Sequence, residues 1–148
     1  MDSCSFFTII GYMKTLLWLD DMRNPFEGDW VYMYSPIGDT DIDIHWVKSY
    51  DEFTDWITKN GMPDGICFDH DLGEDVAREK VSNGMSKRQA HIQKRETKSG
   101  FDCAKWLVEY CMDNDLDLSE IGIQSANPVG ADNIRGLLLN YKKHRNEN

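Results

Sequence analysis

Two short stretches of the sequence place acidic residues directly after apolar runs. In LDDMR the pair Asp20 and Asp21 ends the first run, and in GICFDHDLG a second run ends in Asp69, His70 and Asp71. Several carboxylates brought close together repel one another, and burying them without partners is costly. A hard divalent cation relieves that repulsion and prefers oxygen ligands. We therefore interpret Asp20, Asp21, Asp69 and Asp71 as candidate ligands of Mg²⁺ or Mn²⁺.

Each acidic stretch also has a plainer interpretation. An aspartate after a strand is often a helix cap or a turn former, and Asp71 stands just before Gly73. His70 is a candidate general acid toward a leaving ribose oxygen, or a residue that positions a water, but it can equally be a packed, hydrogen-bonded histidine. Independent caps would not need to share one edge of a sheet, and this favours a common site.

Three further polar residues are candidates for binding a phosphate. The guanidinium of Arg23 matches a phosphate in a bidentate manner, although an ion pair with Asp20 or Asp21 is an alternative that can coexist with that role. Ser125 offers a hydroxyl and Asn127 an amide to phosphate oxygens, and Asn127 is otherwise a turn former.

Alternating strand and helix patterns must position these residues. We expect strands in TLLWL, DIHWVKS, GICF and IGIQS, and we expect turns to dominate residues 22–41, where WVYMY is a candidate for a short strand. Helical spacing of apolar residues predicts helices in YDEFTDWITK, FDCAKWLVEYCMDN and ADNIRGLLLNYKK. Such alternation predicts a parallel sheet of about four strands with helices on both faces, an α/β fold. Ligands of such sheets bind beyond the carboxyl ends of the strands.

Composition limits the classes of partner. The chain has 148 residues, 41% of them hydrophobic, and a net charge of -10. These values suit a single packed domain and argue against binding an extended DNA duplex, which needs many Lys and Arg contacts. The apolar stretch near the N-terminus is too short to span a bilayer and does not resemble a targeting signal, so we expect no membrane partner. The four cysteines show neither zinc-site spacing nor a disulfide framework, so we expect a reducing, cytoplasmic location. We expect an extension over residues 1–13 and one domain over 14–148.

A basic segment stands out in this acidic chain. Residues 74–99 are polar and weakly periodic, and they are expected to form a long loop or helical insertion after the third strand. Lys87 and Arg88 lie in it and are candidates for binding a polyanionic substrate near the acidic site. A solvated charged face is the alternative.

The motifs LDDMRNP, FDHDLG, SGFDCAKWL and SANPVGADNI together resemble the cyclic-phosphate-processing receiver-like family of bacteria and their phages. The resemblance covers roughly residues 14–141. It implies a three-layer, flavodoxin-like receiver fold, and action on a cyclic phosphate of a nucleotide or RNA end in the cytoplasm of a bacterium or a phage-infected cell. Asp69 matches the phosphoacceptor of receiver domains, and Asp71 falls where receivers offer a backbone carbonyl to their metal.

One departure from ordinary receivers bears on function. Receivers carry a lysine after a fifth strand, whereas here Ser125 is followed by ANPVG and a final helix. This argues against phosphorelay and for a metal-dependent cyclic-phosphate hydrolase, with either a metal-oriented hydroxide or Asp69 itself as the nucleophile. The alternatives are a non-catalytic binder of a cyclic nucleotide or RNA terminus, as in phage counter-defence or tRNA processing, and a degenerate receiver used for protein contacts.

Overall fold

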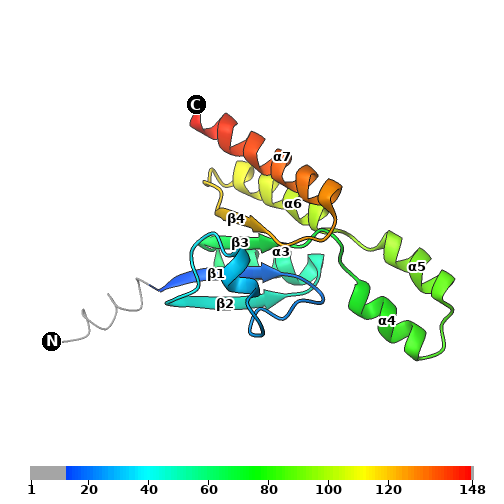
Figure 1. Ribbon diagram of the computed structural model, residues 1–148. Helices are drawn as coiled ribbons and strands as arrows, with labels where there is room; N and C mark the ends of the chain where they lie inside the picture. Colours follow the sequence, from blue (N-terminus) through cyan, green and yellow to red (C-terminus); the bar gives the residue numbers. More distant parts are fainter. Residues whose placement is uncertain (1–12, 148) are drawn as a thin grey trace.

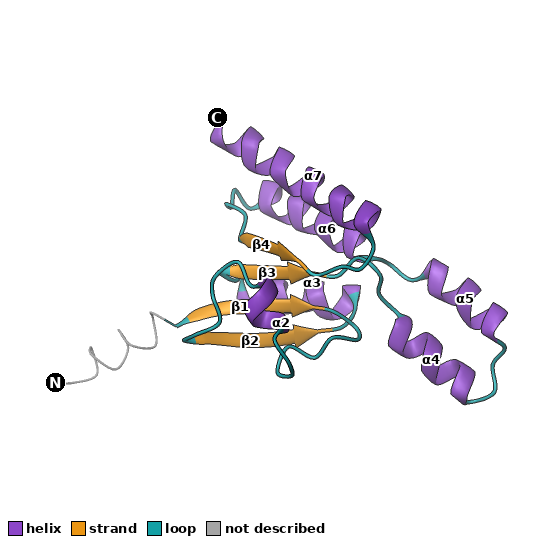
Figure 2. Cartoon of the chain, viewed as in Figure 1, coloured by secondary structure: helices purple, strands orange, loops and turns teal. Residues whose placement is uncertain are grey.

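The fold is built from four strands that alternate with helices, and the computed structural model describes it for residues 13–147 (Figures 1 and 2). The strands are β1 (Lys14–Leu19), β2 (Ile42–Val47), β3 (Gly65–Phe68) and β4 (Glu120–Ile123). The helices are α2 (Trp30–Tyr34), α3 (Tyr50–Asn60), α4 (Glu74–Ser82), α5 (Lys87–Glu96), α6 (Gly100–Asp113) and α7 (Pro128–Asn146).

All neighbouring strands of the sheet are parallel, in the order β2-β1-β3-β4. From β1 the chain adds β2 on one side of β1, and then adds β3 and β4 on the other side. The direction in which strands are added therefore reverses between β1 and β3. Ligands of open parallel sheets bind at this kind of switch point. The predicted α/β receiver-like fold is confirmed, and within residues 13–147 the sheet ends at β4 without a fifth strand.

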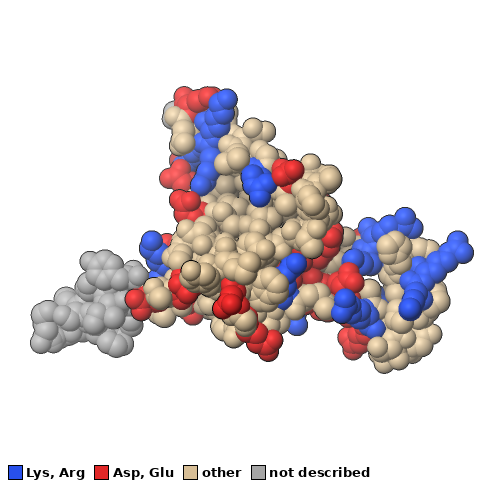
Figure 3. Space-filling model, in the orientation of Figure 1, with Lys and Arg blue, Asp and Glu red and all other residues tan. Residues whose placement is uncertain are grey.

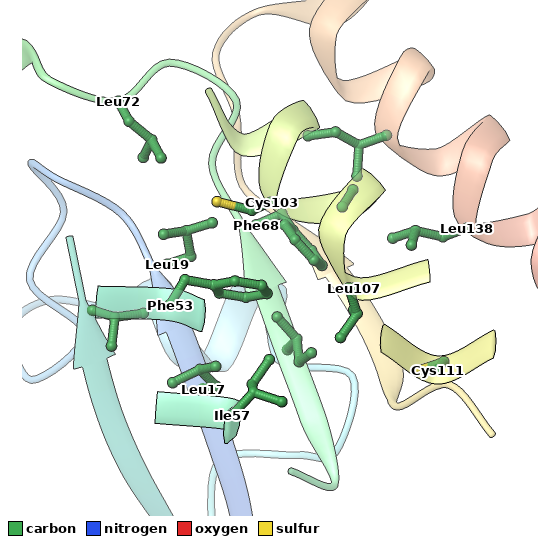
Figure 4. Packing of buried hydrophobic residues seen from close by; sticks show 14 of the residues in the cluster. Leu17, Leu19, Phe53, Ile57, Phe68, Leu72, Cys103, Leu107, Cys111 and Leu138 are labelled. Atoms are coloured by element: carbon green, nitrogen blue, oxygen red, sulfur yellow. The ribbon is translucent and has the colours of Figure 1, made fainter. Parts of the chain in front are cut away.

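One face of the sheet carries the larger hydrophobic core (Figure 4). Leu17 and Leu19 of β1 and Phe68 of β3 point to this face, because side chains alternate along a strand. They pack against apolar residues of α3, α6 and α7, among them Phe53 and Leu107, which are fully buried. This core fixes the position of the strands whose ends carry the acidic residues.

The opposite face is covered by a shorter segment. Leu16, Trp18 and Cys67 pack there against Val31 of α2. The prediction of a strand in WVYMY is wrong, because this segment forms α2 and lies across the sheet instead of pairing with an edge. The sheet therefore has helices on both faces, as predicted.

Capping residues set the ends of two helices. Ser49 caps α3 by accepting a hydrogen bond from Glu52 N, and Gly61 follows its last turn. Ser99 and Asp102 form a reciprocal capping box at the start of α6. The α6 box matters for the site because α6 begins beside the backbone that follows β3.

The basic insertion forms two helices, α4 and α5, which pack against each other as a hairpin that projects from the body (Figure 1). The predicted N-terminal extension, Met13 apart, lies outside the described residues, and the division of the chain at residue 13 stays a prediction. None of the helices in the described range is both long and apolar enough to span a bilayer.

Candidate metal and phosphate site

The backbone at the carboxyl ends of β1 and β3 is held in register by the sheet. Leu19 lies opposite Phe68, so Asp20 and Asp69 follow at the same level of adjacent strands. Asp69 N donates to Leu19 O over 2.9 Å, and Asp20 N donates to Val47 O over 3.1 Å. The sheet hydrogen bonding therefore extends into the site and positions both carboxylates.

Three carboxylates meet at this point. Asp20, Asp21 and Asp69 each offer an oxygen, and these oxygens all lie within 4.8 Å of one another. Their residues are 0%, 3% and 6% exposed. We call these three residues the acidic cluster. A buried group of this kind is expected to repel itself unless cations or hydrogen bonds compensate it.

Asp20 is the best satisfied member of the acidic cluster. Its Oδ1 accepts hydrogen bonds from the backbone N–H groups of Met22 and Arg23, both at 2.9 Å. The Arg23 guanidinium lies 3.5 Å from Asp20 Oδ2 and 4.0 Å from Asp69 Oδ1, with its charge centre 5.1 Å from the ring of Trp30. Arg23 thus partly neutralises the cluster and holds a guanidinium at its rim.

Asp21 faces in two directions. Its Oδ2 accepts from the backbone N–H of Glu74 at 2.6 Å and from that of Asp75 at 3.2 Å, so it caps the start of α4. Its Oδ1 is buried and has no hydrogen-bond partner among the described residues. An unpaired buried carboxylate oxygen inside an acidic cluster is suited to a metal ion.

Burial and mutual repulsion change the acidity of the acidic cluster. Burial, followed by the charges of Asp20 and Asp21, raises the pKa of Asp69 from 3.8 to about 8, although the Arg23 charge opposes this. Burial also raises the pKa of Asp21, despite the hydrogen bonds from the α4 backbone. Without a cation, the site therefore holds a proton on Asp69 at neutral pH.

The acidic cluster fits a hard divalent cation. Three carboxylates and one guanidinium leave about two negative charges, and the donors are all oxygen atoms. The sequence therefore identified a cluster of three aspartates that could hold a divalent metal. Mg²⁺ and Mn²⁺ suit this donor set.

His70 and Asp71 form a pair beside the acidic cluster. His70 Nδ1 lies 2.8 Å from Asp71 Oδ1. Partial burial acts to raise the pKa of Asp71, but hydrogen bonds from His70 and Asn127 and the positive charges of His70 and Lys94 outweigh it and lower that pKa. An ionised carboxylate only accepts hydrogen bonds, so His70 Nδ1 is the donor to Asp71 and Nε2 is left for another partner. Asp71 is not among the residues that meet in the acidic cluster, and its role as a metal ligand stays a prediction.

Gly130 in the first turn of α7 is packed under the His70 ring. A Cβ at this position would overlap the ring atoms, whereas a Cβ at Gly136, farther along α7, would meet nothing within 4 Å. We therefore expect Gly130→Ala to displace the His70 ring and destabilise the protein by about 1–3 kcal/mol, as overpacking does. Thermal unfolding and the NMR signals of the His70 ring would measure this.

Gly136→Ala is the matched control, since Gly136 is exposed on the same helix. It is expected to stabilise the protein by about 0.5–1 kcal/mol through helix propensity and to leave the His70 signals in place. Equal stabilisation by both substitutions, with unchanged His70 signals, would show that Gly130 does not position the ring.

The other predicted substrate contacts lie in two places, the loop before α7 and the far end of the α4–α5 hairpin. Asn127 caps α7 by accepting from Gly130 N at 3.0 Å, and its Nδ2 lies 3.5 Å from His70 Nδ1. Ser125 Oγ accepts from Asn127 N at 3.1 Å and shapes the same loop. Lys87 and Arg88 open α5 at the far end of the hairpin. The substrate roles of these four residues stay predictions.

Sequence reasoning missed Gln124 and Gly100. Gln124 is 1% exposed, and its Nε2 donates to Leu19 O at 3.0 Å and to Asp20 Oδ2 at 3.4 Å. Gly100 N donates to His70 O at 2.8 Å, and a Cβ there would overlap the Asp69 carbonyl. A polar residue ending an apolar strand was a signal for Gln124, but nothing local identified the close packing at Gly100.

Comparison with known families agrees with this geometry. Residues 15–140 match the family described as the cyclic-phosphate processing receiver domain. The chain belongs to this family. No curated protein and no solved structure matches the chain. The expected resemblance is thus confirmed over nearly the whole described range of this receiver-like domain, and the acidic cluster lies inside the matched residues.

Proposed function

We propose that this cyclic-phosphate processing receiver domain is a Mg²⁺-dependent phosphoesterase that opens a cyclic phosphate on a nucleotide or an RNA end. The observation that carries the proposal is the acidic cluster at the switch point of the sheet, with Asp21 Oδ1 buried and unpaired among the described residues. The family description supports a substrate with a cyclic phosphate. The place of action that we propose is the cytoplasm of a bacterium or a phage-infected cell, which the resemblance implies.

Hydrolysis of a cyclic phosphodiester consumes one water. The water oxygen bonds to phosphorus, one ring P–O bond breaks, and the leaving ribose oxygen takes a proton, which gives a phosphomonoester. A bound Mg²⁺ or Mn²⁺ would polarise the phosphoryl oxygens and orient the attacking oxygen. The residues of the chain must bind the phosphate and manage the protons.

Arg23 suits the binding of the phosphate. Its planar guanidinium can donate two parallel hydrogen bonds to a phosphate, and it lies at the rim of the acidic cluster, 24% exposed at the side chain. Ser125 and Asn127 present a hydroxyl and an amide from the loop between β4 and α7. In the proposal these groups hold the phosphoryl oxygens that face away from the cluster.

His70 suits the transfer of the proton. Asp71 accepts a hydrogen bond from His70 Nδ1. This leaves Nε2 to take up a proton and then to donate it to the leaving ribose oxygen. Asp69 either takes the proton of the attacking water or attacks phosphorus itself; in the second case one ring P–O bond breaks, the phosphate joins Asp69 to the remaining ribose oxygen, and water then cleaves the bond between Asp69 and phosphorus. Trapping of the substrate covalently linked to the protein would identify the second route.

The test is incubation of the full chain with Mg²⁺ and RNA bearing a 2′,3′-cyclic phosphate, followed by chromatography of the ends. We expect conversion to a phosphomonoester that stops when EDTA removes the metal. Stoichiometric retention of the RNA without any product would instead show a binding module. Absence of both turnover and retention would leave only the use of this fold for protein contacts.

A further inference from the structure

The α4–α5 hairpin begins at the acidic cluster and extends away from it. Its first residues, Glu74 and Asp75, donate their backbone N–H groups to Asp21 Oδ2. Lys94 of α5 lies 2.6 Å from the Glu74 carboxylate and ties the returning helix to the same end. Figure 1 shows the hairpin pointing outward from the body beyond this attachment. The cluster and the hairpin are therefore directly connected.

The hairpin has a charge opposite to that of the rest of the protein. Residues 74–98 contain seven Lys and Arg and four Asp and Glu, whereas the remainder of the chain contains nine and twenty-two. Figure 3 shows the basic side chains gathered over the hairpin. Lys87, Arg88 and Arg95 are exposed, and the ion pairs described within the hairpin use Arg78 and Lys94 instead. Three unpaired cations on a projecting element are suited to bind a polyanion.

The length of α5 indicates how long a polyanion must be to contact both the acidic cluster and the remote end of the hairpin. Its ten residues rise about 15 Å, and Lys87 and Arg88 lie at the end remote from the acidic cluster. A mononucleotide whose phosphate occupies the cluster is too small to reach them. A strand that continues past its terminal nucleotide would pass along the hairpin and neutralise these cations with its own phosphates.

We propose that the α4–α5 hairpin binds the single strand of an RNA whose cyclic-phosphate end occupies the acidic cluster, so that the substrate is an oligonucleotide and not a free mononucleotide. This inference rests on the proposed function, because the hydrolytic site gives the strand its direction. Lys87, Arg88 and Arg95 contact backbone phosphates and confer no sequence preference.

The binding test uses a fluorescent RNA decamer with an ordinary 3′-hydroxyl, which the enzyme cannot turn over. The triple variant Lys87→Gln, Arg88→Gln, Arg95→Gln is expected to bind it at least about tenfold more weakly by anisotropy. The slope of log K against log salt should fall by about two, since each phosphate contact on a single strand contributes about 0.7. The matched control neutralises Lys14, Lys59 and Lys143, which are exposed on the body, and should bind nearly as the unmodified chain does.

The kinetic test separates this inference from the proposed function. The triple variant should lose at least about tenfold in kcat/KM for a cyclic-ended decamer, and the double variant Lys87→Gln, Arg88→Gln, changed only at the remote end of the hairpin, should keep the kcat/KM of the unmodified chain for a 2′,3′-cyclic mononucleotide. Equal RNA affinity of the triple variant and the unmodified chain, or equal losses in the triple variant and its control, would overturn the role of the hairpin. Lack of turnover of any cyclic phosphate by the unmodified chain, with RNA binding still dependent on the hairpin, would overturn only the hydrolytic function.

Discussion

Asp69→Asn is expected to lower the turnover of RNA with a 2′,3′-cyclic end by at least about a thousandfold, a loss of about 4 kcal/mol of transition-state stabilisation. Asp69 lies within the acidic cluster and within 4.0 Å of Arg23, so it belongs to both the metal and the phosphate parts of the proposed site. Both proposed routes need its carboxylate, either as a proton acceptor or as the nucleophile. Steady-state rates with saturating Mg²⁺ would measure the loss.

A folding defect can be separated from this chemical effect. At neutral pH and without metal the unmodified site already holds a proton on Asp69, and Asn is close in shape to a protonated Asp. Near pH 4 and without metal the variant should therefore unfold near the same temperature as the unmodified protein, and at neutral pH it should unfold at a higher temperature, because only the unmodified chain must take up a proton on folding. Asp55→Asn, on the exposed side of α3, changes the net charge equally and should retain full turnover. Equal turnover by Asp69→Asn and the unmodified protein would remove Asp69 from the chemistry.

The acidic cluster was predictable because strand ends have a strong local signal. TLLWL and GICF are short apolar runs that finish in aspartates, and parallel strands bring their carboxyl ends to one edge. The structure places Asp20 and Asp69 at the same level of β1 and β3, as that rule requires. The helices α3 and α6 were also predictable, since Ser49 and Ser99 are capping residues with clear helical spacing after them.

The prediction of a strand in WVYMY was wrong, because alternation and β propensity do not show whether the segment can pair with a free edge of the sheet. β1 already pairs with β2 and β3, and the segment lies over Leu16 and Trp18 on the open face of the sheet. A short helix covers that face by burying Val31, while the rings of Trp30 and Tyr34 stack at 6.3 Å. Tertiary packing thus overrides the local preference.

The contacts around His70 could not be predicted from the sequence, for a different reason. The pair with Asp71 is local, but the packing under the ring comes from Gly130, sixty positions later in the chain. From the sequence, a glycine in a predicted helix indicates only a weak helix propensity. Its packing role becomes visible only when the structure places a backbone or a ring against it. The same holds for Gly100, whose missing side chain lets α6 approach the Asp69 carbonyl.

Stability and metal affinity should both depend on pH through the acidic cluster. The pKa of Asp69 is raised from 3.8 to about 8, so between these values the unfolded chain loses a proton that the folded, metal-free protein keeps. Asp69 should therefore stabilise the metal-free protein most near pH 4, and this contribution should fall as the pH rises to 8, by up to about 5 kcal/mol. A bound divalent cation favours the carboxylate, so binding below pH 8 must release that proton.

Mg²⁺ affinity should accordingly tighten up to about tenfold per pH unit from pH 5 to pH 8, and the rise in unfolding temperature that Mg²⁺ gives over the metal-free protein should increase over the same range. Calorimetry in two buffers of different ionisation enthalpy would count the protons, with about one expected per ion bound near pH 6. Asp69→Asn should abolish this dependence while Asp55→Asn keeps it. Mg²⁺ binding without proton release at pH 6 would show that Asp69 is already ionised in the metal-free protein, whereas equally tight Mg²⁺ binding by Asp69→Asn and the unmodified protein would remove the metal from the acidic cluster.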